Sequence, residues 1–182
     1  MNEMIASDLG QISDNISAKS LRVHLKKDRG FCYLYYWRKV KASKNPVSRL
    51  YYKIRLRRQY KMSGIEIPQS VKLGKGLSLL HGFGITVNSK AVIGDNCVLM
   101  KGCTIGNVKK ADGAKAPVIG NRVYIGLNSS VVGGIHIGDD VLIAANTFVN
   151  FDVPSHSVVI GSPGVIHHKE DATKYYIKNQ EK

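Results

Sequence analysis

Residues 119–154 read IGNRVY-IGLNSS-VVGGIH-IGDDVL-IAANTF-VNFDVP, six consecutive units of six residues. Each unit begins with Ile or Val, glycine is frequent at its second position, and its fifth residue is small or β-branched. Residues 93–104, IGDNCV-LMKGCT, follow the same period, with Leu as the first residue of the second unit. A fixed short period of this kind is typical of a parallel β-helix, in which each unit is one short strand and one corner.

The period also predicts the interior of the coil. Three units close one triangular turn, so Ile125 should point inward and stack on Ile143. Residues 67–166 are long enough for roughly five such coils around one apolar column. Cys97 and Cys103 fall on fifth positions and are predicted to be small interior side chains, and all three cysteines of the chain should stay reduced.

Two insertions interrupt the period. Two extra residues lie between Leu79 and Val87, beside His81, and a longer loop, NVKKADGAKAPV, occupies residues 107–118. Repeat arrays accept insertions where the chain can bulge outward, and such bulges gather at the working surface. His81 is therefore the first candidate for a functional side chain.

The remaining parts differ in composition. The chain has a net charge of +14, and residues 1–62 hold 15 Lys and Arg against 4 Asp and Glu. Their aromatic and basic runs predict two amphipathic helices with a break near Pro46. We therefore divide the chain into a basic helical segment (1–63), a β-helix (64–166) and a tail (167–182) predicted to form a short helix. The sequence shows no secretory leader and no membrane-spanning run, which predicts a cytoplasmic protein.

The basic segment has three interpretations. It could be a solvated helical pair that supports assembly. It could also be a nucleic-acid surface, but it contains no recognised nucleic-acid motif, so we expect no nucleic acid to bind. It could also dock on the inner face of the membrane, with Trp37 and the tyrosines at the lipid headgroups and the bases on anionic lipid.

Four short motifs carry a family resemblance: IEIP (65–68), LLHG (79–82), TIGN (104–107) and VIGSPGVI (159–166). The chain resembles the serine acetyltransferase branch of the hexapeptide-repeat acyltransferases, and within it the O-acetyltransferases of colanic acid and capsule synthesis. The resemblance implies a left-handed parallel β-helix, a homotrimer with active sites between subunits, and acetyl-CoA as co-substrate. It implies no metal, since the next histidine after His81 is His136.

The resemblance also implies roles for individual residues. His81 would be the general base, Glu66 would be the carboxylate that orients it from one coil below, and the Gly102 N–H would stabilise the oxyanion. The positions implied to bind acetyl-CoA are Asn107, Gly126, Leu127, Ala144 and Ala145, with Lys169 as a cation for its 3′-phosphate.

The acceptor is predicted from departures from the serine enzyme. That enzyme has Asp before its base, where this chain has Leu80, and an Arg-His pair where this chain has Lys115 and Ala116. These differences favour a carbohydrate acceptor, namely a sugar hydroxyl of a surface polysaccharide or its precursor. The alternatives are O-acetylation of serine, or a non-catalytic β-helix scaffold with a membrane-binding basic arm.

Overall fold

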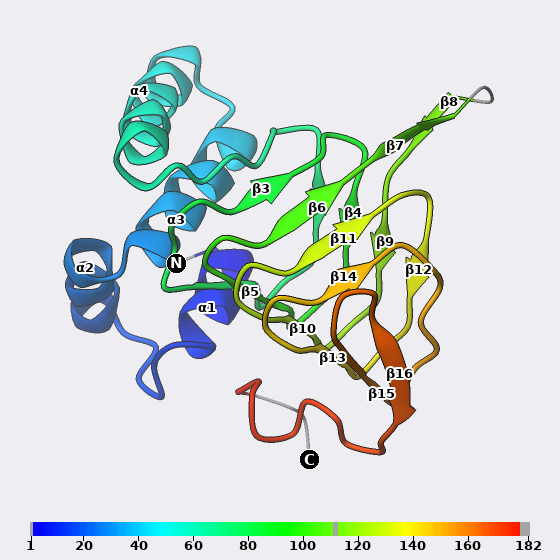
Figure 1. Cartoon of the computed structure of the whole chain (residues 1–182). Coiled ribbons are helices and arrows are strands. Elements are labelled where there is room, and N and C mark those ends of the chain that lie inside the picture. The colour runs from blue at the N-terminus through cyan, green and yellow to red at the C-terminus, as the bar shows by residue number, and fades with distance from the viewer. Residues whose placement is uncertain (1, 111–112, 179–182) are drawn as a thin grey trace.

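Residues 2–110 and 113–178 are described by the structure, a computed structural model. The strands coil around one apolar column, and four helices pack beside the first coils (Figure 1). Three parallel sheets form the faces of the coil, and a two-stranded hairpin projects from it. The prediction of a mainly β protein built as a parallel β-helix is confirmed.

Each sheet collects one strand from every coil. The first sheet is ordered β1 (Lys72–Leu73), β4 (Val92–Ile93), β9 (Val118–Ile119) and β12 (His136–Ile137). The second is ordered β16 (Val165–His168), β15 (Ser157–Ile160), β13 (Val141–Ile143), β10 (Val123–Ile125), β5 (Val98–Met100) and β2 (Ser78–Leu80). The third is ordered β14 (Phe148–Val149), β11 (Ser130–Val132), β6 (Thr104–Gly106) and β3 (Thr86–Val87).

The first residue of each unit builds the core, as predicted. Ile125 pairs in register with Ile143, and both are fully buried. Burying an aliphatic side chain of this size contributes roughly 1.5–3 kcal/mol, so the stacked column is the main stabilising feature of the domain. Cys97 and Cys103 are also fully buried, and burial raises the pKa of both thiols to about 12. Both are interior side chains, which confirms their predicted place, and neither is a thiolate nucleophile.

The longer insertion is a hairpin. β7 (Val108–Lys110) and β8 (Gly113–Lys115) pair antiparallel and project from the corner between β6 and β9 (Figure 1). The sequence predicts a protruding loop here. In the structure this loop is a hairpin, in which β7 and β8 are joined by backbone hydrogen bonds.

Four helices precede the coil, not two. They are α1 (Glu3–Gly10), α2 (Ala18–Lys27), α3 (Arg29–Ala42) and α4 (Pro46–Ser63). The break near Pro46 is confirmed: the Asn45 side chain caps α4, and Pro46 occupies the first turn, where its missing N–H costs nothing. The count was wrong because α1 and α2 are short: each has a cap, at Asn2 or Ser17, and an apolar face of about one turn that packs on Phe31. Within the described residues, no helix has the length and hydropathy to cross a membrane.

α3 is buried on most sides, so the prediction that it is amphipathic was also wrong. Trp37 is 1% exposed, and its Nε1–H donates to the Ile67 carbonyl oxygen at 3.0 Å. Arg38 forms a buried salt bridge with Asp8 of α1, with Nε and Oδ2 3.0 Å apart. Trp37 therefore joins α3 to the start of the coil and is inaccessible to a lipid surface.

The described residues of the tail do not form the predicted C-terminal helix, and residues 179–182 of that prediction lie outside the described residues. Val165–His168 forms β16, which pairs antiparallel with β15, and the described residues after it are turns. A buried carboxylate holds these turns: Asp140 accepts hydrogen bonds from the Ala172 and Thr173 N–H groups and from the Thr173 hydroxyl. Sequence periodicity does not reveal such a long-range anchor.

Candidate active site

His81 lies on an outward bulge at the end of β2. β2 pairs with β5 up to its last residue, and pairing resumes where the Gly102 N–H donates to the Phe83 carbonyl oxygen at 2.9 Å. Residues 81–83 therefore stand opposite Lys101 alone, which places two extra residues beside His81, as the broken period predicted. The φ of His81 is 54°, in the left-handed region that few non-glycine residues adopt, and its side chain is exposed.

The N-terminus of α3 packs directly on this bulge. An ideal Cβ on Gly82 would lie 2.6 Å from the Gly30 main-chain nitrogen, and one on Gly30 would overlap the Leu79 carbonyl oxygen. Only glycine fits at these two positions, because any side chain would push the helix off the coil. The contact brings the residues that start α3 next to His81.

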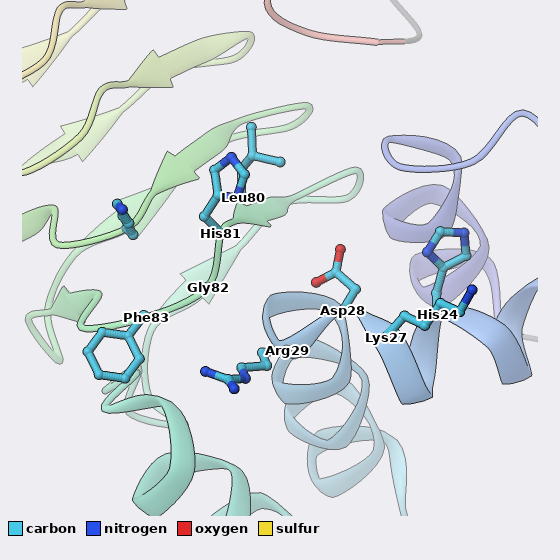
Figure 2. Close-up of a pocket in the computed structure, with 9 residues that line it drawn as sticks. His24, Lys27, Asp28, Arg29, Leu80, His81, Gly82 and Phe83 are labelled. Carbon is cyan, nitrogen blue, oxygen red and sulfur yellow. The ribbon is translucent and has the colours of Figure 1, made fainter.

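Asp28 stands at the junction of α2 and α3. Its N–H donates to the His24 carbonyl oxygen, and its Oδ1 caps α3 by accepting from the Phe31 N–H at 2.9 Å. Figure 2 shows the Asp28 carboxylate pointing into the gap between the His81 and His24 side chains. Because the cap uses Oδ1, Oδ2 is available to a ligand in that gap.

A cavity of about 670 Å³ joins these groups (Figure 2). Its lining contains one carboxylate and three permanent cations together with the imidazoles of His24 and His81. The complete lining is His24, Lys27, Asp28, Arg29, Leu80, His81, Gly82, Phe83 and Lys101. Among the described residues, no salt bridge to an acid occupies Arg29 or Lys101. The cavity therefore presents separate negative and positive groups around an exposed imidazole.

Glu66 does not lie in this cavity. It forms a β-bridge with Thr86 on the third sheet, and it lines a different hollow that includes Tyr60 and Arg57. The prediction that Glu66 stacks below His81 is wrong in register, because the bulge is inserted between the two faces. Its role as the orienting carboxylate remains a prediction, while Asp28 is the carboxylate that shares the cavity with His81.

Four of the residues expected to bind acetyl-CoA come together on the corner that carries His81. Gly126 and Leu127 follow β10, and Ala144 and Ala145 follow β13. The Asn146 N–H donates to the Leu127 carbonyl oxygen at 2.7 Å, and the Asn128 N–H donates to the Lys101 carbonyl oxygen at 3.1 Å. One column of corners therefore runs from the cavity through Lys101 and Leu127 to Ala145.

This column fits an extended chain of amides such as the pantetheine arm. Among the described residues, neither the Leu127 nor the Ala145 N–H donates a backbone hydrogen bond. Ala145 is exposed and its side chain is small, so a ligand can approach the main chain there. The donors lie on successive coils, as a ligand running along the corner requires.

The other implied positions lie elsewhere. Asn107 follows β6 at a different corner, where its Oδ1 accepts from the Asn88 amide at 2.9 Å. Lys169 follows β16, and its N–H donates to the carbonyl oxygen of His156, just before β15 begins. Ala145 follows the last residue of β13, so the two residues lie at opposite ends of these strands. The Gly102 N–H is already bonded to Phe83, so it is not a free oxyanion donor.

Sequence reasoning missed Asp28, Arg29 and Lys101. The signals were present but local: Asp28 directly precedes a helix, as a capping residue does, and Gly30 in the first turn marks a close backbone approach. Nothing in the period connects this helix with a corner more than fifty residues later. Among the described residues, no three His, Cys, Asp or Glu side chains gather as a metal site would require.

Comparisons with known proteins agree with this architecture. The family model described as "Hexapeptide repeat of succinyl-transferase" matches residues 118–150. The serine acetyltransferase of Synechococcus elongatus is 38% identical over 103 residues, covering 57% of this chain and 42% of the relative. That of Helicobacter pylori strain 26695 is 41% identical over 101 residues, covering 56% of this chain and 59% of the relative. The chain thus matches about half the length of these relatives.

Solved structures match over more of the chain. Serine acetyltransferase from Neisseria gonorrhoeae superposes with a TM-score of 0.76 at 28% identity, covering 91% of this chain and 65% of that one. The structure of the same enzyme in complex with serine superposes with a TM-score of 0.73 at 29% identity, covering 89% of this chain and 67% of that one. A Brucella abortus serine acetyltransferase in complex with coenzyme A superposes with a TM-score of 0.68 at 25% identity, covering 82% of this chain and 65% of that one.

These findings correct the predicted acceptor. Every relative and structure named above is a serine acetyltransferase, so the prediction of a polysaccharide O-acetyltransferase is contradicted. The repeat, the fold and the sequence relatives agree with one another. The β-helical part of this chain is therefore similar to the hexapeptide-repeat acyltransferases in sequence and in fold.

Proposed function

We propose that this chain transfers the acetyl group of acetyl-CoA to the hydroxyl of L-serine. The observation that carries the proposal is the exposed His81 imidazole, held on a bulge in a cavity with one carboxylate and several cations. The similarity to serine acetyltransferases, including one in complex with serine, supports this acceptor.

His81 acts as the general base. Its neutral imidazole accepts the proton of the serine hydroxyl as that oxygen bonds to the thioester carbonyl carbon. The carbon–sulfur bond then breaks, and the imidazolium returns the proton to the departing sulfur. The transfer is direct, because burial keeps both β-helix cysteines protonated and away from the cavity.

The cavity has charges that match a serine zwitterion. Asp28 Oδ2 would accept hydrogen bonds from the ammonium group, and Arg29 and Lys101 would hold the carboxylate. These residues offer charges that can replace the Asp and the Arg-His pair of the serine enzyme, where this chain has Leu80, Lys115 and Ala116. Acetyl-CoA would lie along the corner column, with the N–H groups of Leu127 and Ala145 on its amides.

We also propose that the chain assembles as a homotrimer. Apolar side chains exposed on the last coil support an interface between copies: Ile160, Val165 and Ile166 are 50%, 56% and 36% exposed. Light scattering should then give three times the chain mass of 20.0 kDa. A monomer with full activity would contradict a site shared between subunits.

The test is release of free CoA by the purified chain with acetyl-CoA and L-serine. Serinamide and N-acetylserine are the comparison acceptors, because each removes one charge of the zwitterion. His81→Asn is the matched inactive variant, since Asn tolerates the left-handed φ of this position. His136→Asn, on β12 and far from the cavity, is its control.

We expect turnover with L-serine and a loss of about 10²–10⁴-fold in His81→Asn. Thiol release no faster with L-serine than without an acceptor would overturn the proposal. Failure to bind CoA in calorimetry, with a folded protein, would instead favour a non-catalytic scaffold.

A further inference from the structure

α4 carries an exposed apolar face. Val47, Leu50, Tyr51 and Ile54 are 76%, 59%, 51% and 60% exposed, and we call these four residues the α4 stripe. Their spacing of three and four residues places them on one side of the helix. Figure 1 shows α4 on the outside of the helical layer, with α3 between it and the coil.

The opposite side of α4 is fixed against α3. The Tyr52 and Tyr36 rings lie 6.5 Å apart, and the Arg55 guanidinium lies 5.1 Å from the centre of the Tyr36 ring. Leu56 packs against the core, and Ser63 is buried at the end of the helix. The stripe therefore faces outward because the inward positions are occupied by contacts.

The charge of α4 has one sign. Its 18 residues contain Arg49, Lys53, Arg55, Arg57, Arg58 and Lys61 and no acid. No salt bridge neutralises any of them among the described residues. Two copies meeting through α4 would bring like charges together, which disfavours a second copy as the partner. Anionic headgroups above an acyl layer complement both the bases and the stripe.

We propose that α4 docks this chain on an anionic lipid bilayer. The helix lies in the plane of the interface, with the stripe in the acyl boundary and Arg58 and Lys61 at the lipid phosphates. Tyr51, not the buried Trp37, is the aromatic residue at the headgroups. The proposal rests on residues outside the His81 cavity, so it stands or fails independently of the acetyl transfer.

The experiment is flotation of the full chain with phosphatidylcholine vesicles, with and without phosphatidylglycerol. We expect binding only with phosphatidylglycerol, weakened by salt. Arg58→Gln with Lys61→Gln should lower the partition coefficient about 10- to 30-fold, at about tenfold per 1.4 kcal/mol. Leu50→Ser with Ile54→Ser should lower it at least about tenfold. Arg22→Gln with Lys26→Gln removes the same charge from exposed positions of α2 and should leave binding within about twofold.

Circular dichroism and thermal melts establish that each variant is folded. Equal binding to uncharged vesicles, or equal loss in the α2 control, would overturn the proposal. Absence of vesicle binding, with a lower mass of Leu50→Ser/Ile54→Ser in light scattering, would assign the stripe to contact between copies. Retention on a polyuridine column that survives this apolar double substitution, without vesicle binding, would assign the bases to nucleic acid.

Discussion

Gly30 and Gly82 approach each other so closely that a Cβ on Gly82 would lie 2.6 Å from the Gly30 nitrogen. The first residue belongs to a helix of the basic segment, and the second belongs to the bulge of the β-helix. This contact seats Asp28 and Arg29 beside His81, so the candidate site exists only where the two parts of the chain meet.

Substituting Gly82 with Ala should separate the two parts. The added Cβ meets backbone rather than a flexible side chain, so we expect a loss of about 1–3 kcal/mol in the free energy of unfolding. Urea denaturation gives the stability, and CoA release should fall with it. Gly106→Ala is the control, because its Cβ would approach side-chain atoms rather than backbone, the nearest being Val132 Cγ1 at 3.1 Å. Equal stability of both variants would show that the contact is not needed.

Asp28→Asn should separate capping from ligand binding. Asn caps a helix about as well as Asp, so thermal stability should be nearly unchanged, while the KM for L-serine should rise at least about tenfold. Asp28→Ala should lose about 1 kcal/mol of stability in addition. Steady-state kinetics and thermal melts measure the two effects.

Glu66→Gln tests whether Glu66 or Asp28 is the carboxylate that serves the His81 cavity. If Asp28 is the acid that serves the cavity, Glu66→Gln should leave the KM for L-serine within about twofold of the wild type. A large fall in kcat for Glu66→Gln would restore the predicted His81–Glu66 pair and would require the two residues to meet in the assembled protein.

Ala145→Trp should obstruct the corner column. Ala145 is exposed, so the fold should tolerate the larger side chain, while the KM for acetyl-CoA should rise by about tenfold or more and that for L-serine should not. Lys169→Gln is the control, since Lys169 lies beside His156, at the end of the strands of the second sheet opposite to Ala145. A larger rise in the KM for acetyl-CoA in Lys169→Gln than in Ala145→Trp would place the acetyl-CoA site near Lys169 instead.

Asp140→Asn should weaken the C-terminal turns. Burial opposes ionisation of Asp140, but hydrogen bonds from Thr173, His156 and Ala172 outweigh it and hold its pKa below the usual value. A lowered pKa in the folded state stabilises the protein above the unfolded pKa of about 4, and this contribution is lost as pH falls through the folded value. We expect Asp140→Asn to lose about 1–3 kcal/mol at neutral pH. The difference from wild type should shrink in acid, as urea denaturation at several pH values will measure.

The sequence predicts the coil well because its signal is local and repeated. Ile125 and Ile143 are one full coil apart, and the rule that pairs them holds along the whole column. The bulge at His81 was visible for the same reason, as a departure from a regular period.

The candidate site was predicted only in part because it is assembled from two unlike segments. Asp28 and Lys101 reach the His81 cavity through a helix contact and a coil register. No periodicity describes the helix contact, and one bulge is enough to shift Glu66 onto another face. The acceptor prediction rested on Leu80 and Ala116 as missing charges. It did not take into account the charged side chains of Asp28, Arg29 and Lys101, which line the same cavity as His81.

The antiparallel pairing of β16 has a consequence for self-association. A parallel coil ends in unpaired strand edges, which invite another stack to add end to end. Here β16 runs antiparallel to the strands of the coil and forms the edge of the second sheet, and it carries His167 and His168. Another stack would meet this antiparallel strand rather than a continuation of the parallel coil, which disfavours end-to-end growth at that edge.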